Sequence, residues 1–459
     1  MKTWLILTTA ALLAASSAFA DLFITAPADG ATVPLLTDAQ KAYLAMPRAE
    51  RRVKFADHDF RKREMGLPAE MIAGTKETRM AYWPKTVRLA WVATENVSPC
   101  RVSVKDVKTG AIVYETEVKR SPAHVDNLEI AAEYEWTVSG GGEKATSKFR
   151  TEDMAPRLVR FPGVPNVRDL GGRIGLGGKR VKQGMIFRSA GLNSNAGATY
   201  YTKEELEKSG KLPELEKKIA EAEKRLNQLE AWQKEPATMD REDKEYKEWC
   251  GRHKTDPVAK FLTSRIKWAK DQIAKKDFKI EKGKAAGKSR VEGENGAYIL
   301  KRFGIKSDID LRSDGECYGM NGSPLGEAVT WFHYSSSAYG GMQGDKGKEA
   351  FKKVFKVFLD RKNYPIDFHC IAGQDRTGAV AFILNALLGV EEDQLYLDWE
   401  TTGFWNRGNG FCHEKLFDGL VKGFRKNYPA PTINESVEKY VLSLGFTPED
   451  IATFRGIML

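Results

Sequence analysis

The sequence predicts a multidomain protein in which an α/β domain, with a central sheet flanked by helices, follows a small β-sandwich and carries a helical-hairpin insertion. Three patterns indicate this. Short alternating segments typical of strands occur in residues 86–151. Two runs with helical apolar spacing occur in residues 215–273. Residues 364–389 read as a strand, a Gly-containing loop and a helix. A chain of 459 residues can bury more than one core.

Residues 1–20 are predicted to be a secretory signal peptide. An apolar stretch from Trp4 to about Ala15 follows Lys2, and Ala18-Phe19-Ala20 supplies the small residues of a cleavage site. We expect the mature chain to begin near Asp21 and to be periplasmic or secreted. The apolar stretch is too short for a comfortable membrane span, and no other segment approaches eighteen apolar residues, so no transmembrane span is expected.

Residues 21–152 are predicted to hold an N-terminal segment and a β-sandwich. Thr86–Val92 alternates as a strand, and Arg101–Val107 and Ala111–Val118 flank a turn. The later pattern around Tyr134 and Trp136 resembles that of fibronectin type III and related sandwiches. A carbohydrate- or partner-binding module and a structural spacer packed on the next domain both fit this pattern, and we favour the spacer.

A helical insertion is predicted at about residues 196–287. Its two apolar runs are Leu215, Ile219, Ala222, Leu226 and Leu229, then Val258, Leu262, Ile266, Ala269 and Ile273. Spacings of three and four residues are typical of helices that pack against each other. The charged segment 235–256 would join them into an antiparallel hairpin. Packing of the hairpin on itself, capping of an active site and binding of a partner protein are all compatible with this pattern.

The run from His369 to Gly378 combines a nucleophile with an anion-binding loop. It lies between a predicted strand, 364–368, and a predicted helix, 377–388. Successive backbone N–H groups and the positive end of a helix form a site for phosphate oxygens, and the loop residues that would supply them are Ile371, Ala372, Gly373, Gln374 and Asp375. Arg376 can bind two phosphate oxygens in a fork, and positive surroundings stabilise a Cys370 thiolate. A buried core thiol would not require this spacing of residues.

These residues resemble a known family. His369-Cys370 followed by Gly373, Arg376 and Thr377 is similar to the Cys-x5-Arg signature of protein tyrosine phosphatases. The Asp375-Arg376-Thr377-Gly378 ending resembles the bacterial branch with dual-specificity and phosphoinositide-active members. Four more segments fit that branch, and with them the resemblance covers about 155–195 and 288–459: Asn166–Gly172, Phe187–Ala190, Gly304–Ser313 and Asp398–Thr401.

The resemblance implies a two-step reaction without a metal or another cofactor. Cys370 would attack phosphorus to form a phosphocysteine, which water then hydrolyses, while Arg376 holds the transferred group. Thr377 would hydrogen-bond the thiolate and help it to leave. His369 would orient the loop from behind.

The general acid is the least defined part of the predicted site. Many family members carry an Asp on a loop upstream of the Cys, but the corresponding segment here, 333–340, has no carboxylate. Asp375 is the preferred candidate because it lies beside Arg376 in the loop itself. Asp310 is the alternative, although it could instead fix Arg312.

Two neighbouring residues, Arg168 and Asp169, are candidates for the wall of the pocket. They lie in a turn-like segment that Gly171-Gly172 would allow to reverse tightly. Direct contact with the substrate is one reading, and a purely structural role is the other.

The number of cysteines and the net charge limit the disulfides, metal sites and ligands that the chain can be expected to have. The five cysteines are too few and too dispersed for a disulfide framework, and they lack metal-ligand spacing; they are residues 100, 250, 317, 370 and 412. Cys317 follows the Asp310-Leu311-Arg312 segment and could form a protective disulfide with Cys370. The net charge of +10 suits anionic ligands, but no nucleic-acid motif is present.

The predicted function is therefore an exported protein-tyrosine or dual-specificity phosphatase. A phosphoinositide or soluble inositol phosphate is the alternative substrate, although Ile371, Ala372 and Gln374 supply none of the basic side chains that polyphosphates would favour. A protein that binds phosphate without turnover is an alternative of another class, and the intact Cys370 and Arg376 oppose it. A rhodanese-like sulfurtransferase would not need the Arg376-Thr377 ending.

Overall fold

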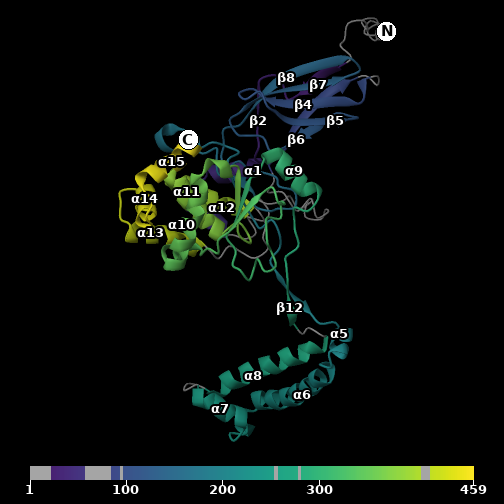
Figure 1. The fold of residues 1–459 in the computed structure, drawn as a ribbon, viewed down its shortest axis with the longest axis vertical. Coiled ribbons are helices and arrows are strands. Elements are labelled where there is room, and N and C mark those ends of the chain that lie inside the picture. Colours follow the sequence, from purple (N-terminus) through teal and green to yellow (C-terminus); the bar gives the residue numbers. More distant parts are fainter. Residues whose placement is uncertain (1–21, 57–83, 94–96, 253–256, 278–280, 405–413) are drawn as a thin grey trace, which may run out of the picture. The chain divides into compact units, whose positions relative to one another are not determined.

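A computed structural model describes residues 22–56, 84–93, 97–252, 257–277, 281–404 and 414–459. The predicted signal peptide and Cys412 lie outside the described residues. The chain divides into two compact units, one made of residues 1–195 and 288–459 and the other of residues 196–287 (Figure 1). The mixed α/β, multidomain fold class predicted from the sequence is confirmed.

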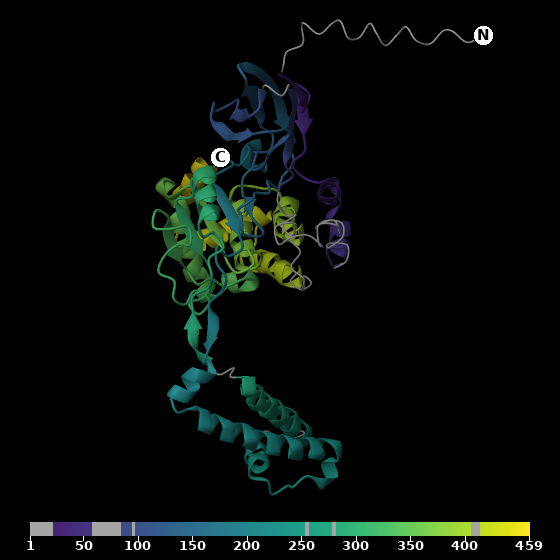
Figure 2. The same cartoon turned by 90° about the vertical axis from the view of Figure 1, so that its right-hand side faces the viewer.

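The first unit begins with two β-sheets that share one hydrophobic core (Figure 2). One sheet has the order β1 (Leu22–Ala26), β3 (Val87–Ala93), β6 (Ala123–Val125). The other has the order β2 (Ala31–Val33), β8 (Glu143–Thr151), β7 (Glu133–Gly140), β4 (Cys100–Asp106), β5 (Ile112–Val118). Alternate residues of β7 point into the core because strand side chains alternate between faces, and these residues are Tyr134, Trp136 and Val138.

Two helices, α1 (Asp38–Ala45) and α2 (Arg48–Ala56), lie between β2 and β3 in the chain and contact the α/β part of the same unit. Thr37 forms a capping box that starts α1. The Arg51 side chain is 1% exposed and its Nε lies 2.9 Å from the Glu400 carboxylate. Helix α2 is thus fastened to the α/β part by a buried ion pair.

The α/β part is built on a five-stranded sheet whose strand order is β14 (Thr330–His333), β13 (Ser307–Asp310), β15 (Ile366–His369), β10 (Ile186–Ser189) and β9 (Arg168–Asp169). Neighbouring strands are parallel except β9, which pairs antiparallel with β10. The three central strands are buried at every position, as expected for a parallel sheet covered on both faces.

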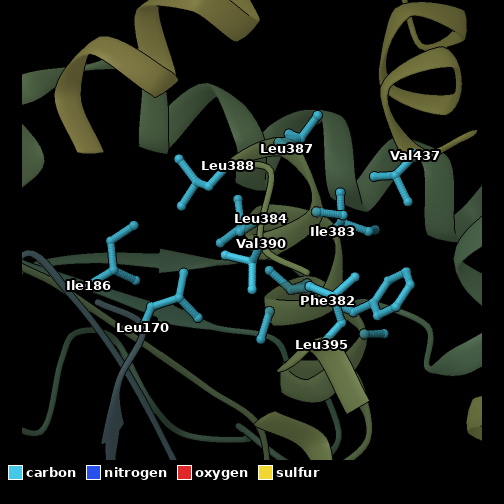
Figure 3. Packing of buried hydrophobic residues seen from close by; sticks show 14 of the residues in the cluster. Leu170, Ile186, Phe382, Ile383, Leu384, Leu387, Leu388, Val390, Leu395 and Val437 are labelled. Carbon is cyan, nitrogen blue, oxygen red and sulfur yellow. The ribbon is translucent and has the colours of Figure 1, made fainter. Parts of the chain in front are cut away.

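Helices cover both faces of this sheet. On one face Phe187 packs against Phe303 of α9 (Glu294–Phe303). On the other face Ile186 and Phe368 join a larger core with the remaining helices. Figure 3 shows Ile186 among residues of this core such as Leu384 and Val390. Those helices are α10 (Asp345–Leu359), α11 (Arg376–Leu387), α12 (Glu392–Glu400), α13 (Glu414–Asn427), α14 (Ile433–Ser443) and α15 (Pro448–Met458). α11 is buried along almost its whole length, which explains its continuous apolar sequence.

The second unit consists of a two-stranded ribbon and a group of helices. β11 (Gly197–Tyr200) and β12 (Glu281–Ala285) pair antiparallel. Four helices lie between these two strands in the chain: α5 (Lys203–Lys208), α6 (Leu212–Lys234), α7 (Lys244–Arg252) and α8 (Pro257–Ile273). α6 and α8 pack side by side through Leu229 and Phe261.

The segment expected only to join the two long helices contains a helix of its own, α7. Tyr246, Trp249 and Cys250 are spaced by three and four residues and join the core that α6 and α8 form. The short apolar stripe was obscured in the sequence by the high charge of the surrounding residues.

Candidate active site

The loop from Cys370 to Asp375 connects the central strand β15 to the first turn of α11. It therefore lies at the carboxyl end of a parallel strand and at the positive end of a buried helix, the usual place for an anion site in such sheets. Gly373 has φ +65°, and a Cβ there would lie 2.4 Å from the Ser189 carbonyl oxygen. Only glycine fits this close approach of the loop to β10.

The Cys370 thiol lies at the base of the loop and is almost fully buried. Burial acts to raise its pKa. The charge of Arg376 and hydrogen bonding by the Thr377 side chain and backbone outweigh burial, so the pKa of Cys370 is lowered. A lowered pKa increases the fraction of thiolate at neutral pH, which is the nucleophilic form.

His369 lies directly behind the loop and is fully buried. Its Nε2 is 3.0 Å from the Asp308 carboxylate, and its Nδ1 is 3.3 Å from the Cys370 carbonyl oxygen. Burial acts to lower the pKa of His369, but the carboxylates of Asp310 and Asp308 raise it to about 9. The imidazole is thus protonated at neutral pH and donates to the loop from behind.

Hydrogen bonds from the surrounding elements hold the loop carbonyl groups on its outer side. The contacts are Gly191 N to Ile371 O at 3.2 Å, Asn166 Nδ2 to Ala372 O at 2.8 Å and Arg188 Nη2 to Gly373 O at 2.6 Å. The C=O and N–H of one trans peptide point in opposite directions. Fixing the carbonyl groups outside therefore turns the N–H groups of residues 372–374 toward the concave side, where phosphate oxygens would lie.

One of these donors, Arg188, is itself held by Asp398 of α12. Its carboxylate contacts Arg188, lies 3.2 Å from Arg173 Nη2 and lies 3.7 Å from Arg168 Nε. All four side chains are 2% exposed or less. Burial acts to raise the pKa of Asp398, but the three guanidinium groups lower it to about 2. The cluster keeps a net positive charge under the loop, which favours a bound anion.

Arg168 and Asp169 do not line a pocket wall, contrary to that part of our expectation. Arg168 is 1% and Asp169 is 0% exposed. Arg168 donates to the Asn166 side chain, and Asp169 accepts from the Gly171 and Gly184 amides and from Arg157. Their polar character reflects a buried hydrogen-bond network rather than a surface that meets substrate.

Asp310 is likewise a structural carboxylate in this structure. It is 0% exposed and pairs with the Arg312 guanidinium at 2.6 Å. Burial acts to raise the pKa of Asp310, but His369 and Arg312 hold it far below its usual range. A proton donor must carry a proton at working pH, so these surroundings oppose a role as general acid.

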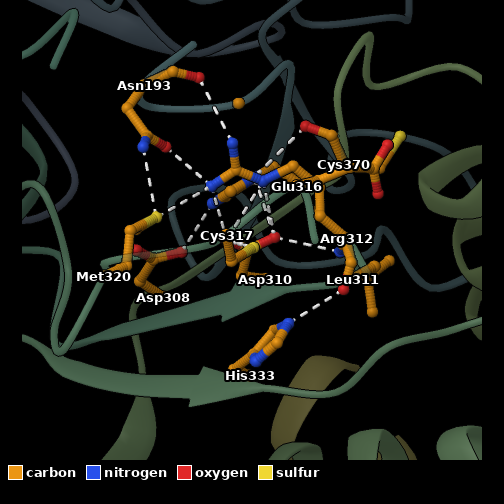
Figure 4. Close-up of polar contacts among 12 residues, drawn as sticks. Asn193, Asp308, Asp310, Leu311, Arg312, Glu316, Cys317, Met320, His333 and Cys370 are labelled. Carbon is orange, nitrogen blue, oxygen red and sulfur yellow. Dashed lines mark hydrogen bonds and ion pairs between the residues drawn. The ribbon is translucent and has the colours of Figure 1, made fainter. Parts of the chain in front are cut away.

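Cys317 and Cys370 are both free thiols here, so the disulfide considered from the sequence is not formed. The Cys317 sulfur donates to Asp310 Oδ2 at 3.2 Å (Figure 4). Burial and the nearby Asp310 carboxylate raise the pKa of Cys317 to about 12. A thiol in such surroundings is a poor nucleophile.

Arg376 is paired with a residue that the sequence reasoning missed, Glu316. Nη1 and Nη2 of Arg376 lie 2.7 and 3.1 Å from the two Glu316 oxygens. Glu316 also accepts from the Ser313 amide and hydroxyl. The Ser-x-x-Glu spacing of residues 313–316 is the pattern of a capping box and could have drawn attention to this carboxylate.

Asp375 is partly exposed at the start of α11, where its side chain does not cap the helix. Its Oδ1 accepts a hydrogen bond from the Tyr339 hydroxyl. Tyr339 comes from the segment in which the family resemblance places a carboxylate, and the sequence reasoning assigned it no role. Of the remaining loop side chains, Ile371 is partly exposed, whereas Ala372 and Gln374 are buried.

Comparison with known families agrees with this geometry. The profile of the tyrosine phosphatase family matches residues 159–208 and 286–459, which include the whole loop and all five strands of the sheet. Through these two segments the chain belongs to the tyrosine phosphatase family. The gap between the matched segments, residues 209–285, falls entirely within the second unit, residues 196–287. A comparison with curated proteins finds no match.

Among the residues that the structure describes, no three His, Cys, Asp or Glu side chains are grouped so that they could hold a metal ion. No helix in the same residues is both long and apolar enough to cross a membrane.

Proposed function

We propose that this tyrosine phosphatase family member is an exported phosphatase of the protein-tyrosine or dual-specificity type, acting through a phosphocysteine. The observation that carries the proposal is geometric: Cys370 lies next to Arg376 and Thr377, at the base of a loop whose carbonyl groups are hydrogen-bonded on its outer side. The lowered pKa of Cys370 is consistent with this arrangement. Export rests on the predicted signal peptide alone.

In the first step the Cys370 thiolate attacks phosphorus, forming the S–P bond as the P–O bond to the leaving group breaks. Asp375 gives its proton to the departing oxygen, because a poor leaving group needs that proton in the transition state. Arg376 and the loop amides bind the three equatorial oxygens, where charge accumulates. These roles for Asp375 and Arg376 match their partly exposed positions at the start of α11.

In the second step water attacks the phosphocysteine, and the Asp375 carboxylate accepts the proton that the water loses. Cys370 leaves as a thiolate, which the Thr377 hydroxyl and the charge of Arg376 stabilise. The protonated His369 contributes from behind, through the Cys370 carbonyl group. All of these groups belong to the chain itself, so the proposed cycle uses no cofactor.

The loop side chains favour a substrate with a single phosphate. Arg376 is the one cation among residues 370–377, and Ile371, Ala372 and Gln374 offer no charge for further phosphates. A phosphorylated protein fits this site better than a polyphosphorylated inositol. A phosphoinositide is the second candidate, supported by the resemblance of the Asp375–Gly378 ending to phosphoinositide-active members.

The two other parts of the chain would have supporting roles. The pair of sheets sharing one core in residues 22–151 supports a fibronectin type III-like module. Contacts of this module with the α/β part support the spacer role, for example Arg157 Nη2 to the Asn127 carbonyl oxygen at 2.9 Å. The α6 and α8 pair buries its apolar side chains within its own unit. A partner protein for this unit is the alternative.

The test is hydrolysis of an aryl phosphate by the purified mature protein under reducing conditions. We expect turnover that Cys370→Ser abolishes and that a chelator leaves unchanged. Cys250→Ser, which alters a partly buried thiol in the second unit, is the matched control and should keep full activity. Turnover that survives Cys370→Ser, or that the chelator removes, would contradict the proposed chemistry.

A further inference from the structure

Tyr339 reaches the catalytic loop from an unusual backbone conformation. It begins a short 3-10 helix, Tyr339–Gln343, and its φ is +49°, in the left-handed region that bulky side chains rarely adopt. Residues held there despite the steric cost are concentrated at functional sites. The positive φ of Tyr339 therefore indicates that its side chain has a function that requires this backbone conformation.

The Tyr339 ring is fixed by packing. The side chain is 5% exposed and makes edge contacts with Trp399 and Phe417, each with ring centroids 6.5 Å apart. Trp399 and Phe417 stack on one another at 4.7 Å, so the three rings form one rigid group. The direction of the Tyr339 hydroxyl is therefore determined by the core and not by the loop that it contacts.

That hydroxyl donates to Oδ1 of Asp375. Burial and the Asp375 carboxylate raise the pKa of Tyr339 far above its usual range, so the phenol remains a donor at every working pH. When Oδ1 accepts this hydrogen bond, a proton bound by Asp375 resides on the other oxygen, Oδ2. The contact thus selects which carboxyl oxygen carries the transferable proton.

We propose that Tyr339 is a positioning residue for Asp375, which holds Oδ1 and directs the proton on Oδ2 to the leaving group. This inference rests on the proposed phosphatase function and on Asp375 as its acid. As the P–O bond breaks, Oδ2 loses its proton to the leaving oxygen, and the new carboxylate strengthens its hydrogen bond with Tyr339. Tyr339 then stabilises the transition state more than the ground state.

Residues 333–340 contain no carboxylate, yet with Tyr339 as a positioning residue this segment still contributes to proton transfer. The segment places a phenol instead, and the carboxylate comes from the loop. Two separate elements must then meet for proton transfer, one from the connection before α10 and one from the start of α11.

The test compares leaving groups. The rates of wild type, Tyr339→Phe and Asp375→Asn are measured on aryl phosphates whose phenols cover a wide range of acidity. General acids typically contribute roughly 10²- to 10⁴-fold, and mostly for poor leaving groups. We expect the rate of Tyr339→Phe to match that of wild type on the best leaving group and to be roughly tenfold lower or more on the poorest. The rate should therefore depend more steeply on leaving-group acidity in this variant, as it should in Asp375→Asn.

A matched control is Tyr364→Phe, which removes a buried hydroxyl that bonds the Phe358 carbonyl oxygen away from the loop. It should keep the leaving-group dependence of wild type even if it lowers the melting temperature. The double variant Tyr339→Phe/Asp375→Asn should be no slower than Asp375→Asn alone, because Tyr339 acts through Asp375.

Three results would overturn the inference. In the first, the rate of Tyr339→Phe depends on leaving-group acidity as that of wild type does. In the second, Tyr339→Phe loses the same factor in rate on every substrate, and that factor equals the loss in Tyr364→Phe. In the third, the dependence on leaving-group acidity is steeper in Tyr339→Phe but not in Asp375→Asn. The last would make the phenol itself the donor. Failure of the underlying function is distinguishable, since it would appear as an inactive wild type or an active Cys370→Ser, before any comparison of leaving groups.

Discussion

Glu316 holds the guanidinium of Arg376 end-on, with Nη1 and Nη2 lying 2.7 and 3.1 Å from its two carboxylate oxygens. A guanidinium has five N–H groups, so an end-on pair still leaves the edge that contains Nε. That edge is the one available for two phosphate oxygens. The pair with Glu316 fixes the plane of the Arg376 guanidinium before a substrate arrives. The Arg376 side chain is 18% exposed, so it remains accessible to a substrate.

Glu316→Gln tests whether this orientation matters. The amide cannot accept from both Nη groups, so Arg376 loses its fixed plane, and we expect kcat to fall roughly 10- to 100-fold through misplacement of the clamp. Steady-state kinetics on an aryl phosphate measures this. Glu327→Gln, an exposed residue on the same connection between β13 and β14, should have no effect. An unchanged or higher kcat in Glu316→Gln would show that the pair is not required.

Gly373→Ala should inactivate the enzyme. The added Cβ would lie 2.4 Å from the Ser189 carbonyl oxygen, so the loop must move away from β10. We expect kcat/KM to fall by at least roughly 10²-fold. Gly177→Ala is the matched control, since Gly177 also has φ +65° but has nothing within 4 Å of the added Cβ. It should lose about 1 kcal/mol of stability and keep its activity; equal activity losses in both variants would contradict the close-approach argument.

Asp398→Asn should destabilise the fold strongly, because it leaves three buried guanidinium groups without their shared carboxylate. Removing one partner of a buried ion pair costs about 3–5 kcal/mol. Denaturant unfolding near pH 7 measures the loss. Asp153→Asn, which breaks the Asp153–Arg180 pair whose Asp153 side chain is 63% exposed, should cost less than about 1 kcal/mol. Similar losses in both variants would mean that the buried cluster contributes little.

The same carboxylate predicts a pH dependence. The pKa of Asp398 is lowered to about 2 in the folded protein, so the unfolded chain binds its proton more tightly. Its stabilisation is complete above about pH 4 and is lost as the pH falls through about 2. Acid unfolding followed by circular dichroism should therefore have a weaker pH dependence in Asp398→Asn than in wild type. An identical dependence would contradict the assignment.

His369 should influence stability at alkaline pH. Its folded pKa is raised to about 9, so the folded state binds the proton more tightly than the unfolded chain. The stabilisation is present below about pH 6.5 and is lost as the pH rises through about 9. In His369→Asn the decline of the unfolding free energy with pH should be shallower by up to about 1.4 kcal/mol per pH unit in this window. His124→Asn, an exposed histidine, should keep the wild-type slope; an unchanged slope in His369→Asn would refute the protonated state.

The central strand, loop and helix were predictable from the sequence because their signals are local. The helix expected at residues 377–388 is α11, Arg376–Leu387, and Gly389 follows it with φ +74°. The strand expected at 364–368 is β15, Ile366–His369. Apolar runs and the Cys-x5-Arg spacing need no knowledge of distant contacts.

Glu316 and Tyr339 were missed because they act across the fold. Glu316 reaches Arg376 over 60 residues of chain, and Tyr339 reaches Asp375 over 36. Polar residues such as Asp310 and Arg168 pose the opposite problem. Charged side chains are usually exposed, but Asp310 pairs with Arg312 and Arg168 lies beside Asp398 inside the core. The first pair could be considered from the sequence because its residues are close in the chain. Arg168 and Asp398 are 230 positions apart, and no local pattern links them.

The proposed phosphocysteine can be tested directly by capturing the phosphoryl group on Cys370. Reduced protein is mixed with an aryl phosphate, quenched in acid within the first turnover and digested, and the phosphorylated residue is located by mass spectrometry. We expect a phosphocysteine on the peptide that contains Cys370. It should appear together with a burst of phenol and be absent in Cys370→Ser. Turnover with no adduct under any quench, or an adduct on another residue, would contradict it.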